Sequence, residues 1–352
     1  MPSKTISVVL MVMGLAALVG CGSSSTHTAY VTLPSLNAIA AYRIDDTSAR
    51  FTTIVGSPYP AGTSPSSILV HPSGRFVYVA NQGDNNVELF SIDRTVGALL
   101  EVSPRTATGL APTSLAMDTP GSFLFALNQV SGSISAYSIN SGSGALSPVA
   151  GSPFPTFPNP VAMAITPSAK FLYVINANLA SIFAYTVSSG VVRPVAGLPV
   201  AVGAGPFAVT VDPGEKFVYV ANLIDGTVSV LSINSTTGAL TVIGAYATGT
   251  RPTSLAVLGQ FLFVGNQGST TISVFSVDST TGVLTQIVGS PFTAGSPPFF
   301  EVIDPNGKFL YTGSQSSNLI SVLSITAGTG VLATSTESAS TTAGPASMAV
   351  SK

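Results

Sequence analysis

The 352-residue sequence predicts an all-β protein, a seven-bladed β-propeller with four antiparallel strands in each blade. Three observations lead to this prediction: a composition suited to strands and turns, a repeat of about 47 residues, and four short apolar runs within each repeat. The chain has 34 glycines, 25 prolines and no tryptophan, and Val, Ser and Thr are abundant. This mixture favours strands and turns over helices.

A proline marks the start of every repeat. The seven register prolines are Pro65, Pro112, Pro160, Pro206, Pro252, Pro298 and Pro345. An apolar run follows each of them, and a second run follows a turn, such as RFVYVAN at 75–81 or KFVYVAN at 216–222. A third run, such as TVSVLSIN at 227–234, ends at a Ser/Thr/Gly turn, and a fourth begins at the next apolar pair. No run has an apolar face at helical spacing over three turns, so each repeat is interpreted as four short strands separated by turns.

The two ends of the chain are expected to build one blade together. The seventh proline-led run stops at the C-terminus, and three further strands are expected at residues 29–33, 38–45 and 51–56. Pairing of these N-terminal strands with the C-terminal strand would close the ring non-covalently. An outer-membrane barrel is the rival fold, but its strands run about 10 residues with polar and apolar positions alternating. The runs here are shorter, and many are apolar on both faces.

The first 20 residues are predicted to be a lipoprotein signal peptide. Lys4 gives a positive start, and the apolar core at residues 6–19 is too short to span a bilayer as an ordinary helix. The core is followed by Gly20 and Cys21, the only cysteine, in a pattern that resembles a bacterial lipobox. We therefore expect residues 21–27 to be a lipidated cysteine with a flexible tether, and residues 28–352 to form the propeller. The alternative is a plain signal peptide with an incidental cysteine. The expected location is the bacterial cell envelope, lipid-anchored and facing the periplasm or the cell surface.

Charge and composition also bear on partners and cofactors. The formal net charge is −2, and the 12 basic residues are scattered, so no nucleic-acid partner is expected. No Cys/His pattern or carboxylate spacing typical of metal ligands occurs, so no metal or other cofactor is expected either. We expect the protein to be a monomer.

The repeat exposes two outlying residues that are candidates for catalysis. Three residues after each register proline the side chain is apolar, except in the sixth unit, where it is Glu301. Arg251 stands directly before Pro252, where the other units have small or uncharged residues. Both are expected near one end of the central channel on adjacent blades. They could form a structural ion pair, an acid/base and oxyanion-binding pair, or no contact.

Candidate ligand-binding residues end the second strand of five blades, on the face that also carries the connections between blades; Ser314 and Leu33 are the exceptions. The candidates are Asn81, Asn128, Asn176, Asn222 and, after a two-residue deletion, Asn266. Asparagine at this position either caps the turn by bonding the local backbone or lines a polar channel mouth that binds a ligand. Asp84 and Asp225 lie in loops on the same face and could add polar contacts.

The YVAN strand, the DPxGKF turn and the SxxTGxL hairpin resemble the seven-bladed β-propeller lactonase family, which includes 6-phosphogluconolactonase-like enzymes and a muconate-cyclising branch. Similar repeats also occur in cell-surface propellers of no known activity. The resemblance spans residues 28–352 and implies lactone hydrolysis, which needs a base for water and a donor for the oxyanion. Family enzymes are thought to use His, Arg and Glu groups at the channel mouth, and here only Arg251 and Glu301 are available.

Two hypotheses follow. The first is a lactonase-like hydrolase acting on a neutral or weakly charged lactone in the envelope, since a sugar phosphate would require several cationic groups. The second is a non-catalytic propeller that binds a surface polymer, a protein or another ligand on the same face. Sparse titratable groups favour the second hypothesis.

Overall fold

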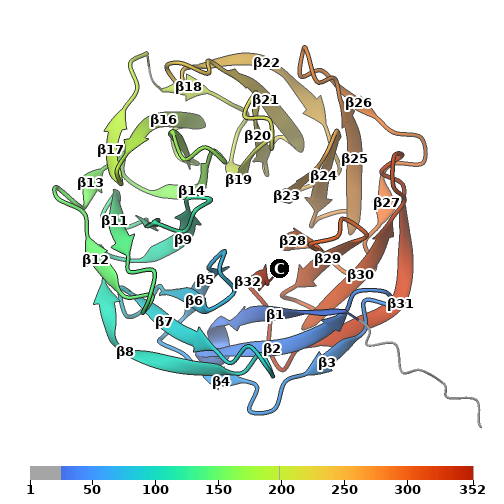
Figure 1. Ribbon diagram of the computed structural model, residues 1–352. Helices are drawn as coiled ribbons and strands as arrows, with labels where there is room; N and C mark the ends of the chain where they lie inside the picture. The colour runs from blue at the N-terminus through green and yellow to red at the C-terminus, as the bar shows by residue number, and fades with distance from the viewer. Residues whose placement is uncertain (1–24, 198, 352) are drawn as a thin grey trace, which may run out of the picture.

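The computed structural model describes residues 25–351 apart from residue 198, and it confirms the seven-bladed propeller. Seven antiparallel sheets surround a central axis and follow one another around the ring in chain order (Figure 1). We number the blades from 1, which holds the chain termini, to 7. Four strands form the main path of every sheet, as the repeat predicts.

The strands occupy four positions from the axis outward. The innermost strands, from blade 1 to blade 7, are β32 (Ser347–Val350), β5 (Pro65–Val70), β9 (Pro112–Met117), β14 (Pro160–Ile165), β19 (Pro206–Val211), β23 (Pro252–Leu258) and β28 (Phe300–Ile303). The second strands are β1 (Thr26–Leu33), β6 (Phe76–Asn81), β10 (Phe123–Asn128), β15 (Phe171–Asn176), β20 (Phe217–Asn222), β24 (Phe261–Asn266) and β29 (Phe309–Ser314). The third strands are β2 (Ala38–Asp45), β7 (Asn86–Ile92), β11 (Ser133–Ile139), β16 (Ser181–Ser188), β21 (Thr227–Ile233), β25 (Thr271–Val277) and β30 (Leu319–Ile325).

The outer strands vary most in length, from three to nine residues. The outer strands are β3 (Phe51–Thr53), β8 (Leu99–Ala107), β12 (Leu146–Pro148), β17 (Val191–Pro194), β22 (Leu240–Ala247), β26 (Leu284–Gln286) and β31 (Leu332–Ser340). Four blades add a two-residue strand that also pairs with the third strand: β4 (Tyr59–Pro60), β13 (Phe154–Pro155), β18 (Val200–Ala201) and β27 (Phe292–Thr293). A short 3-10 helix, η1 (Pro34–Leu36), links β1 to β2. Within the described residues, no helix has the length and apolar character needed to cross a membrane.

Apolar side chains fill the seams between neighbouring blades. Seven buried clusters are present, and each draws its residues from two adjacent sheets. The tyrosine of the YVAN strand is fully buried and links blades by a hydrogen bond as well as by its ring. Tyr78 of blade 2 donates to the Gly144 carbonyl in blade 3 at 2.7 Å, and Tyr173 of blade 4 donates to Gly238 of blade 5 at 3.2 Å. The repeated YVAN motif therefore serves mainly to join neighbouring blades.

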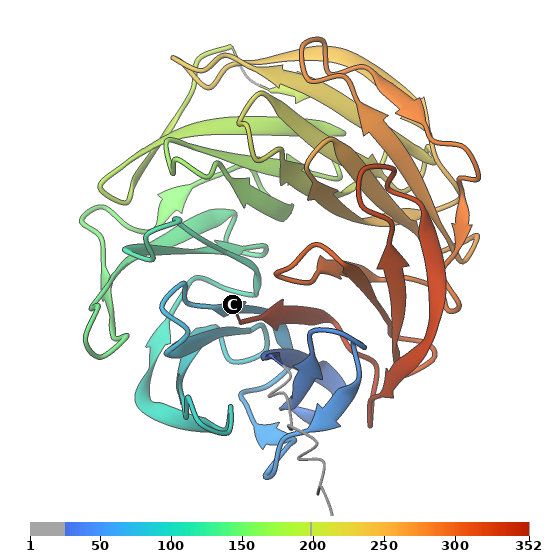
Figure 2. The same cartoon turned by 45° about the vertical axis from the view of Figure 1, so that its right-hand side comes forward.

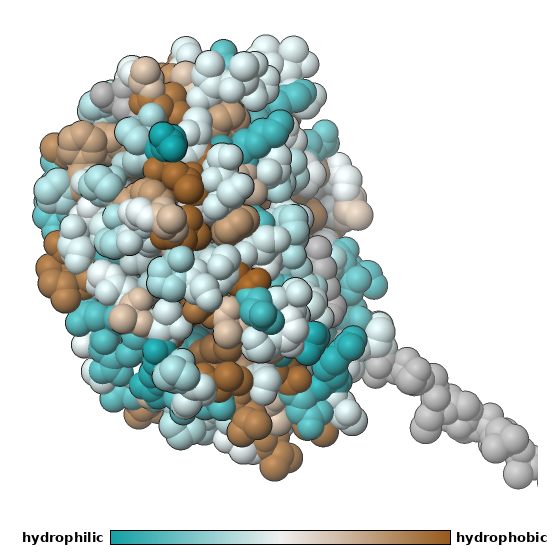
Figure 3. All heavy atoms as spheres, turned by 60° about the vertical axis from the view of Figure 1, so that its left-hand side comes forward, coloured by the Kyte–Doolittle hydropathy of each residue, from teal (hydrophilic) through white to brown (hydrophobic). Residues whose placement is uncertain are grey.

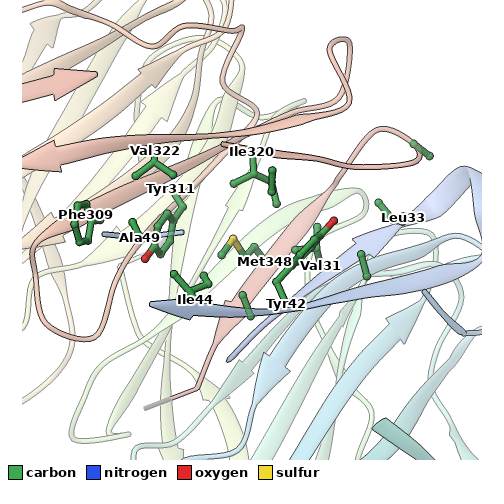
Figure 4. Close-up of a cluster of buried hydrophobic side chains, with 14 residues drawn as sticks. Val31, Leu33, Tyr42, Ile44, Ala49, Phe309, Tyr311, Ile320, Val322 and Met348 are labelled. Carbon is green, nitrogen blue, oxygen red and sulfur yellow. The ribbon is translucent and has the colours of Figure 1, made fainter. Parts of the chain in front are cut away.

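Blade 1 is closed by pairing between the chain ends, as expected. Residues Ala29 to Thr32 of β1 pair antiparallel with Val350 to Ser347 of β32, and Figure 2 shows the blue and red ends side by side. Apolar side chains of blades 1 and 7 meet around Met348 in the seam beside this junction (Figure 4). Ring closure therefore combines backbone pairing with a buried core.

The propeller starts earlier than expected. β1 begins at Thr26, so Thr26 and His27 belong to the first strand and not to a tether ending at residue 27. His27 is buried, and its Nδ1 lies 2.6 Å from the Asp46 carboxylate. These polar residues carry no apolar strand signal, which explains the difference. The predicted signal peptide and Cys21 lie outside the described residues.

Candidate functional site at the channel mouth

A β-bulge follows the register proline in five of the seven blades. In five blades the pairing between the first two strands skips one residue, and the skipped residues are Ser66, Thr113, Val161, Phe207 and Thr253. Bulges of this kind change the direction of a side chain and so re-aim it out of the sheet. The equivalent residues of blades 7 and 1 are Phe299 and Ala346, and each comes directly before the first paired residue of its strand.

Six of these seven residues line a cavity of about 490 Å³ at one end of the axis. We call this end the mouth; it lies on the face where the second strands end and the third strands begin. The remaining residue, Thr253, is buried and donates a hydrogen bond to the Pro298 carbonyl at 2.9 Å. The complete lining is Pro34, Ser64, Ser66, Gln82, Thr113, Gln129, Val161, Phe207, Phe299, Gln315 and Ala346.

The mouth has a polar side and an apolar side. Blades 2 and 3 contribute hydroxyls and the amides of Gln82 and Gln129, whereas Val161 and Phe207 come from blades 4 and 5. Phe207 meets Phe299 of blade 7 edge to face, with ring centroids 6.0 Å apart. None of the described residues that line the cavity is charged. In the described part of the chain, no three His, Cys, Asp or Glu side chains are grouped so that they could hold a metal ion.

The five asparagines do not line the mouth, so the prediction that they contact a ligand there is wrong. Asn81, Asn128, Asn176, Asn222 and Asn266 are each at most 1% exposed. Asn128 is representative, because its Nδ2 donates to Ser133 at 3.1 Å and to Ser135 at 2.9 Å across the hairpin that follows. Asn176 instead accepts the Leu179 backbone N–H at 3.1 Å. These contacts agree with the alternative interpretation, in which asparagine secures the turn.

Asp84 and Asp225 have structural contacts and are not part of the cavity lining. The Asp84 carboxylate accepts the Thr63 backbone N–H at 2.8 Å, and Asp225 accepts the Ala204 N–H at 2.7 Å. Both therefore hold the connection that enters their own blade. The hydrogen bond from the Thr63 N–H is the main cause that lowers the pKa of Asp84 below its ordinary value. The expected addition to a ligand site is not seen for either residue.

Arg251 and Glu301 do not contact each other, which is the third of the alternatives considered for this pair. Among the described residues they form no ion pair, and neither lines the mouth cavity. Arg251 is exposed, with a left-handed φ of 55°, and its guanidinium donates to the Gln267 side-chain oxygen at 3.5 Å. Glu301 is 9% exposed, and its carboxyl lies in the seam between blades 7 and 6, beside Gly265.

Glu301 sits among polar groups that lack partners. Neither carboxyl oxygen makes a well-formed hydrogen bond, and the hydroxyls of Ser254 and Thr312 are also buried without one. Gly265 makes room for the carboxyl, because a Cβ at that position would lie 2.9 Å from Oε1. Burial raises the pKa of Glu301 to about 8, and the nearby Ser254 hydroxyl and Gly265 N–H offset this only in part. The carboxyl is therefore mostly protonated at neutral pH.

A second buried carboxylate, Glu88 on β7, was missed by the sequence reasoning. It accepts hydrogen bonds from the Gly62 N–H at 2.9 Å and from Asn81 at 3.0 Å, and Arg105 reaches its other oxygen at 2.7 Å. In blade 3 the same two bonds go to the hydroxyl of Ser135. Burial raises the pKa of Glu88, and these donors oppose the shift. The replacement of serine by glutamate in the third strand was the available signal.

Comparison with known proteins identifies the family. The model of the family described as lactonase, 7-bladed beta-propeller, matches residues 23–165 and 156–350. The chain belongs to this family. A search of curated protein sequences finds no match.

Solved structures of lactonase-type propellers share the fold of this family member. A candidate 6-phosphogluconolactonase of Bacteroides fragilis superposes with a TM-score of 0.80 at 22% identity, covering 94% of this chain and 99% of that one. A candidate 6-phosphogluconolactonase of Bacteroides uniformis gives 0.80 at 21% identity, with 92% and 99% covered. A periplasmic gluconolactonase of Pseudomonas aeruginosa gives 0.80 at 18% identity, with 93% and 99% covered. At these identities the likeness establishes the fold alone.

Replacing Glu301 should change how stability depends on pH. The unfolded chain loses the Glu301 proton near the ordinary value of 4.5, whereas the folded protein keeps it to about 8. The free energy of unfolding should therefore fall as pH rises from about 4.5 to 8, by about 3–5 kcal/mol from this group. Urea unfolding of wild type and Glu301→Gln across this range measures the difference, because the amide does not titrate.

A Glu337→Gln variant on outer strand β31 serves as the control and should follow the wild-type curve. Parallel curves for wild type and Glu301→Gln would show that the Glu301 carboxyl is not protonated by burial in the folded protein.

Proposed function

We propose that the mouth cavity binds a neutral, hydroxylated ring compound of the sugar or sugar-lactone class, and that the protein is a binding propeller. The observation that carries this proposal is the two-sided lining, with amides and hydroxyls opposite a pair of phenylalanine rings and no charged side chain among the described lining residues. A volume of about 490 Å³ falls within the range of small-molecule sites.

The lining suits the chemistry of a sugar ring. A glutamine amide both donates and accepts hydrogen bonds, as does each ligand hydroxyl, so Gln82, Gln129 and Gln315 can pair with several hydroxyls. The C–H faces of the ring would pack on Phe207 and Phe299. A phosphate ester is a poor match, because phosphate is normally held by arginine, lysine or helix N-termini, which the described lining lacks.

Removing the glutamine amides should weaken this binding. We expect methyl β-glucoside to bind the wild-type protein and the affinity to fall about tenfold in Gln82→Ala/Gln129→Ala, since each neutral hydrogen bond contributes roughly 0.5–1.5 kcal/mol. Glucose 6-phosphate should bind no more tightly than glucose. Isothermal titration calorimetry measures these affinities.

Gln260→Ala is the matched control, because Gln260 is an exposed glutamine in the turn between β23 and β24, at the far ends of those strands from the mouth. Equal weakening in Gln260→Ala and the double variant, or tighter binding of the phosphate ester, would count against the proposed site.

Hydrolysis of a lactone is the second candidate function, favoured by the family and by the raised pKa of Glu301. A catalytic base must come within hydrogen-bond reach of the attacking water, directly or through one further water. Glu301 lies two residues beyond the lining residue Phe299, but its carboxyl is buried in the seam with blade 6. Binding without hydrolysis is therefore our first choice.

The binding proposal predicts no turnover of lactones. Glucono-1,5-lactone and γ-butyrolactone should hydrolyse at the buffer rate in the presence of wild type, Glu301→Gln or Arg251→Gln, followed by pH-stat titration. A wild-type rate well above buffer that falls in Glu301→Gln would instead establish the lactonase function and give Glu301 a catalytic role.

We further propose that the propeller is exported and held in the cell envelope by a lipid on Cys21. The support comes from the sequence of the first 21 residues and from the position of Thr26. Thr26 pairs with Asp45 at the end of β1 far from the mouth, while Leu33 at the other end adjoins the lining residue Pro34. A short anchor at Cys21 would thus leave the mouth directed away from the membrane.

Replacing Cys21 should release the protein from the membrane. In cells fed labelled palmitate, the wild-type protein should take up label and sediment with membranes, whereas Cys21→Ala should do neither, because more than one buried acyl chain is needed for stable anchoring. A Cys21→Ala protein that remains labelled and membrane-bound would contradict the lipid anchor without affecting the ligand proposal.

A further inference from the structure

Large apolar side chains are exposed beside the mouth on three consecutive blades. We call them the apolar arc; exposure ranges from 46% to 73%, and the members are Leu110 and Val130 of blade 3, Phe157 and Leu179 of blade 4, and Ile224 of blade 5. All lie in loops on the mouth face, either after a second strand or in the connection that enters the blade. Figure 3 brings the flank of blades 3 and 4 forward and shows apolar patches interrupting a more polar surface.

The arc is a local departure from the repeat and is not required by the fold. Val130 stands two residues after the asparagine that ends its second strand. The same position is Gly83 in blade 2, Gly268 in blade 6 and Ser316 in blade 7. Those blades form equivalent hairpins with small residues, so turn geometry does not demand an apolar side chain. Exposed apolar residues grouped in this way generally mark a binding surface.

The arc joins the apolar side of the cavity. The Ile224 side chain packs over Gly205, which stands two residues before the lining residue Phe207, and a Cβ on Gly205 would lie 2.7 Å from Ile224 Cγ1. At its other end the arc adjoins the polar side, because Val130 directly follows the lining residue Gln129.

Between these ends, Phe157 stacks on Phe183 with ring centroids 4.2 Å apart, and its blade supplies the lining residue Val161. Exposed apolar residues of blades 3 to 5 therefore stand within a few residues of the lining residues Gln129, Val161 and Phe207.

We propose that the ligand is amphipathic, with a hydroxylated ring in the cavity and a hydrocarbon chain lying on the apolar arc. This inference rests on the proposed function, because it assigns the ring to the same cavity. The polar wall of blades 2 and 3 holds the ring hydroxyls, and the chain leaves along the opposite wall, past Phe207, where the arc begins. Alkyl or acyl derivatives of a sugar or of a sugar lactone have this chemistry.

A series of alkyl β-glucosides tests the inference below their critical micelle concentrations. Methyl, butyl, hexyl and octyl glucosides should bind wild type with a dissociation constant that falls about twofold per methylene, since the chain is only partly buried on a surface. In Leu179→Ser/Ile224→Ser, the methyl glucoside should bind as in wild type, and the gain with chain length should disappear. Isothermal titration calorimetry gives each affinity.

A Val288→Ser variant is the matched control, because Val288 is 94% exposed in the turn between β26 and β27 and lies outside the arc. It should keep the full chain-length effect. An affinity that is the same for methyl and octyl glucosides in wild type would overturn the inference while leaving the proposed function intact.

Three other outcomes also decide against the inference. A chain-length effect that survives in Leu179→Ser/Ile224→Ser would place the chain elsewhere. A wild-type dimer that this double variant dissociates, seen by analytical ultracentrifugation, would assign the arc to a second copy of the protein. No binding of any glucoside would reject both the inference and the proposed sugar site.

Discussion

The pairing of β1 with β32 is the contact on which the rest of the structure depends. Each blade has apolar residues on both faces, and seven seams can be buried only when the first and last blades meet. Four residue pairs between Ala29–Thr32 and Ser347–Val350, with the cluster around Met348, supply that closure. Because the ring is closed, the innermost strands converge on one axis, and the cavity at the mouth is a product of closure and not of any single blade.

The bulges after the register prolines of blades 2 to 6 then help to decide which residues face the mouth. A regular strand would send successive side chains to opposite faces of its blade, where neighbouring blades bury them. The extra residue breaks that alternation and brings one side chain of each of blades 2 to 5 to the cavity, whereas Thr253 of blade 6 stays buried. The seven positions carry no structural demand for a common residue type, as Ser66, Val161 and Phe207 show. Variation here can change what the mouth binds without altering the seams.

Much of the fold and little of the site could be predicted from the sequence. The spacing of the prolines and the apolar run of each strand were enough to predict the number of blades, the order of strands and the blade that the two chain ends share. The mouth left a weaker signal: glutamine follows the last residue of the second strand at Gln82, Gln129 and Gln315, but also at Gln267, which does not line the cavity. The direction of the Glu301 side chain could not be predicted. It depends on the strand pairing after the register proline and on the space left by Gly265, which lies in another blade.

The placement of charge limits the chemistry available at the mouth. Glu301 and Glu88 are buried within or between blades. Asp84 and Asp225 accept hydrogen bonds from backbone N–H groups. None of these four carboxyl groups lines the cavity. What remains around the cavity, among the described residues, is amide, hydroxyl and aromatic surface. Such groups recognise a neutral ligand by hydrogen bonding and packing, but none is a proton acceptor poised near neutral pH. The recognition function proposed for the mouth is thus compatible with the lactonase propeller fold.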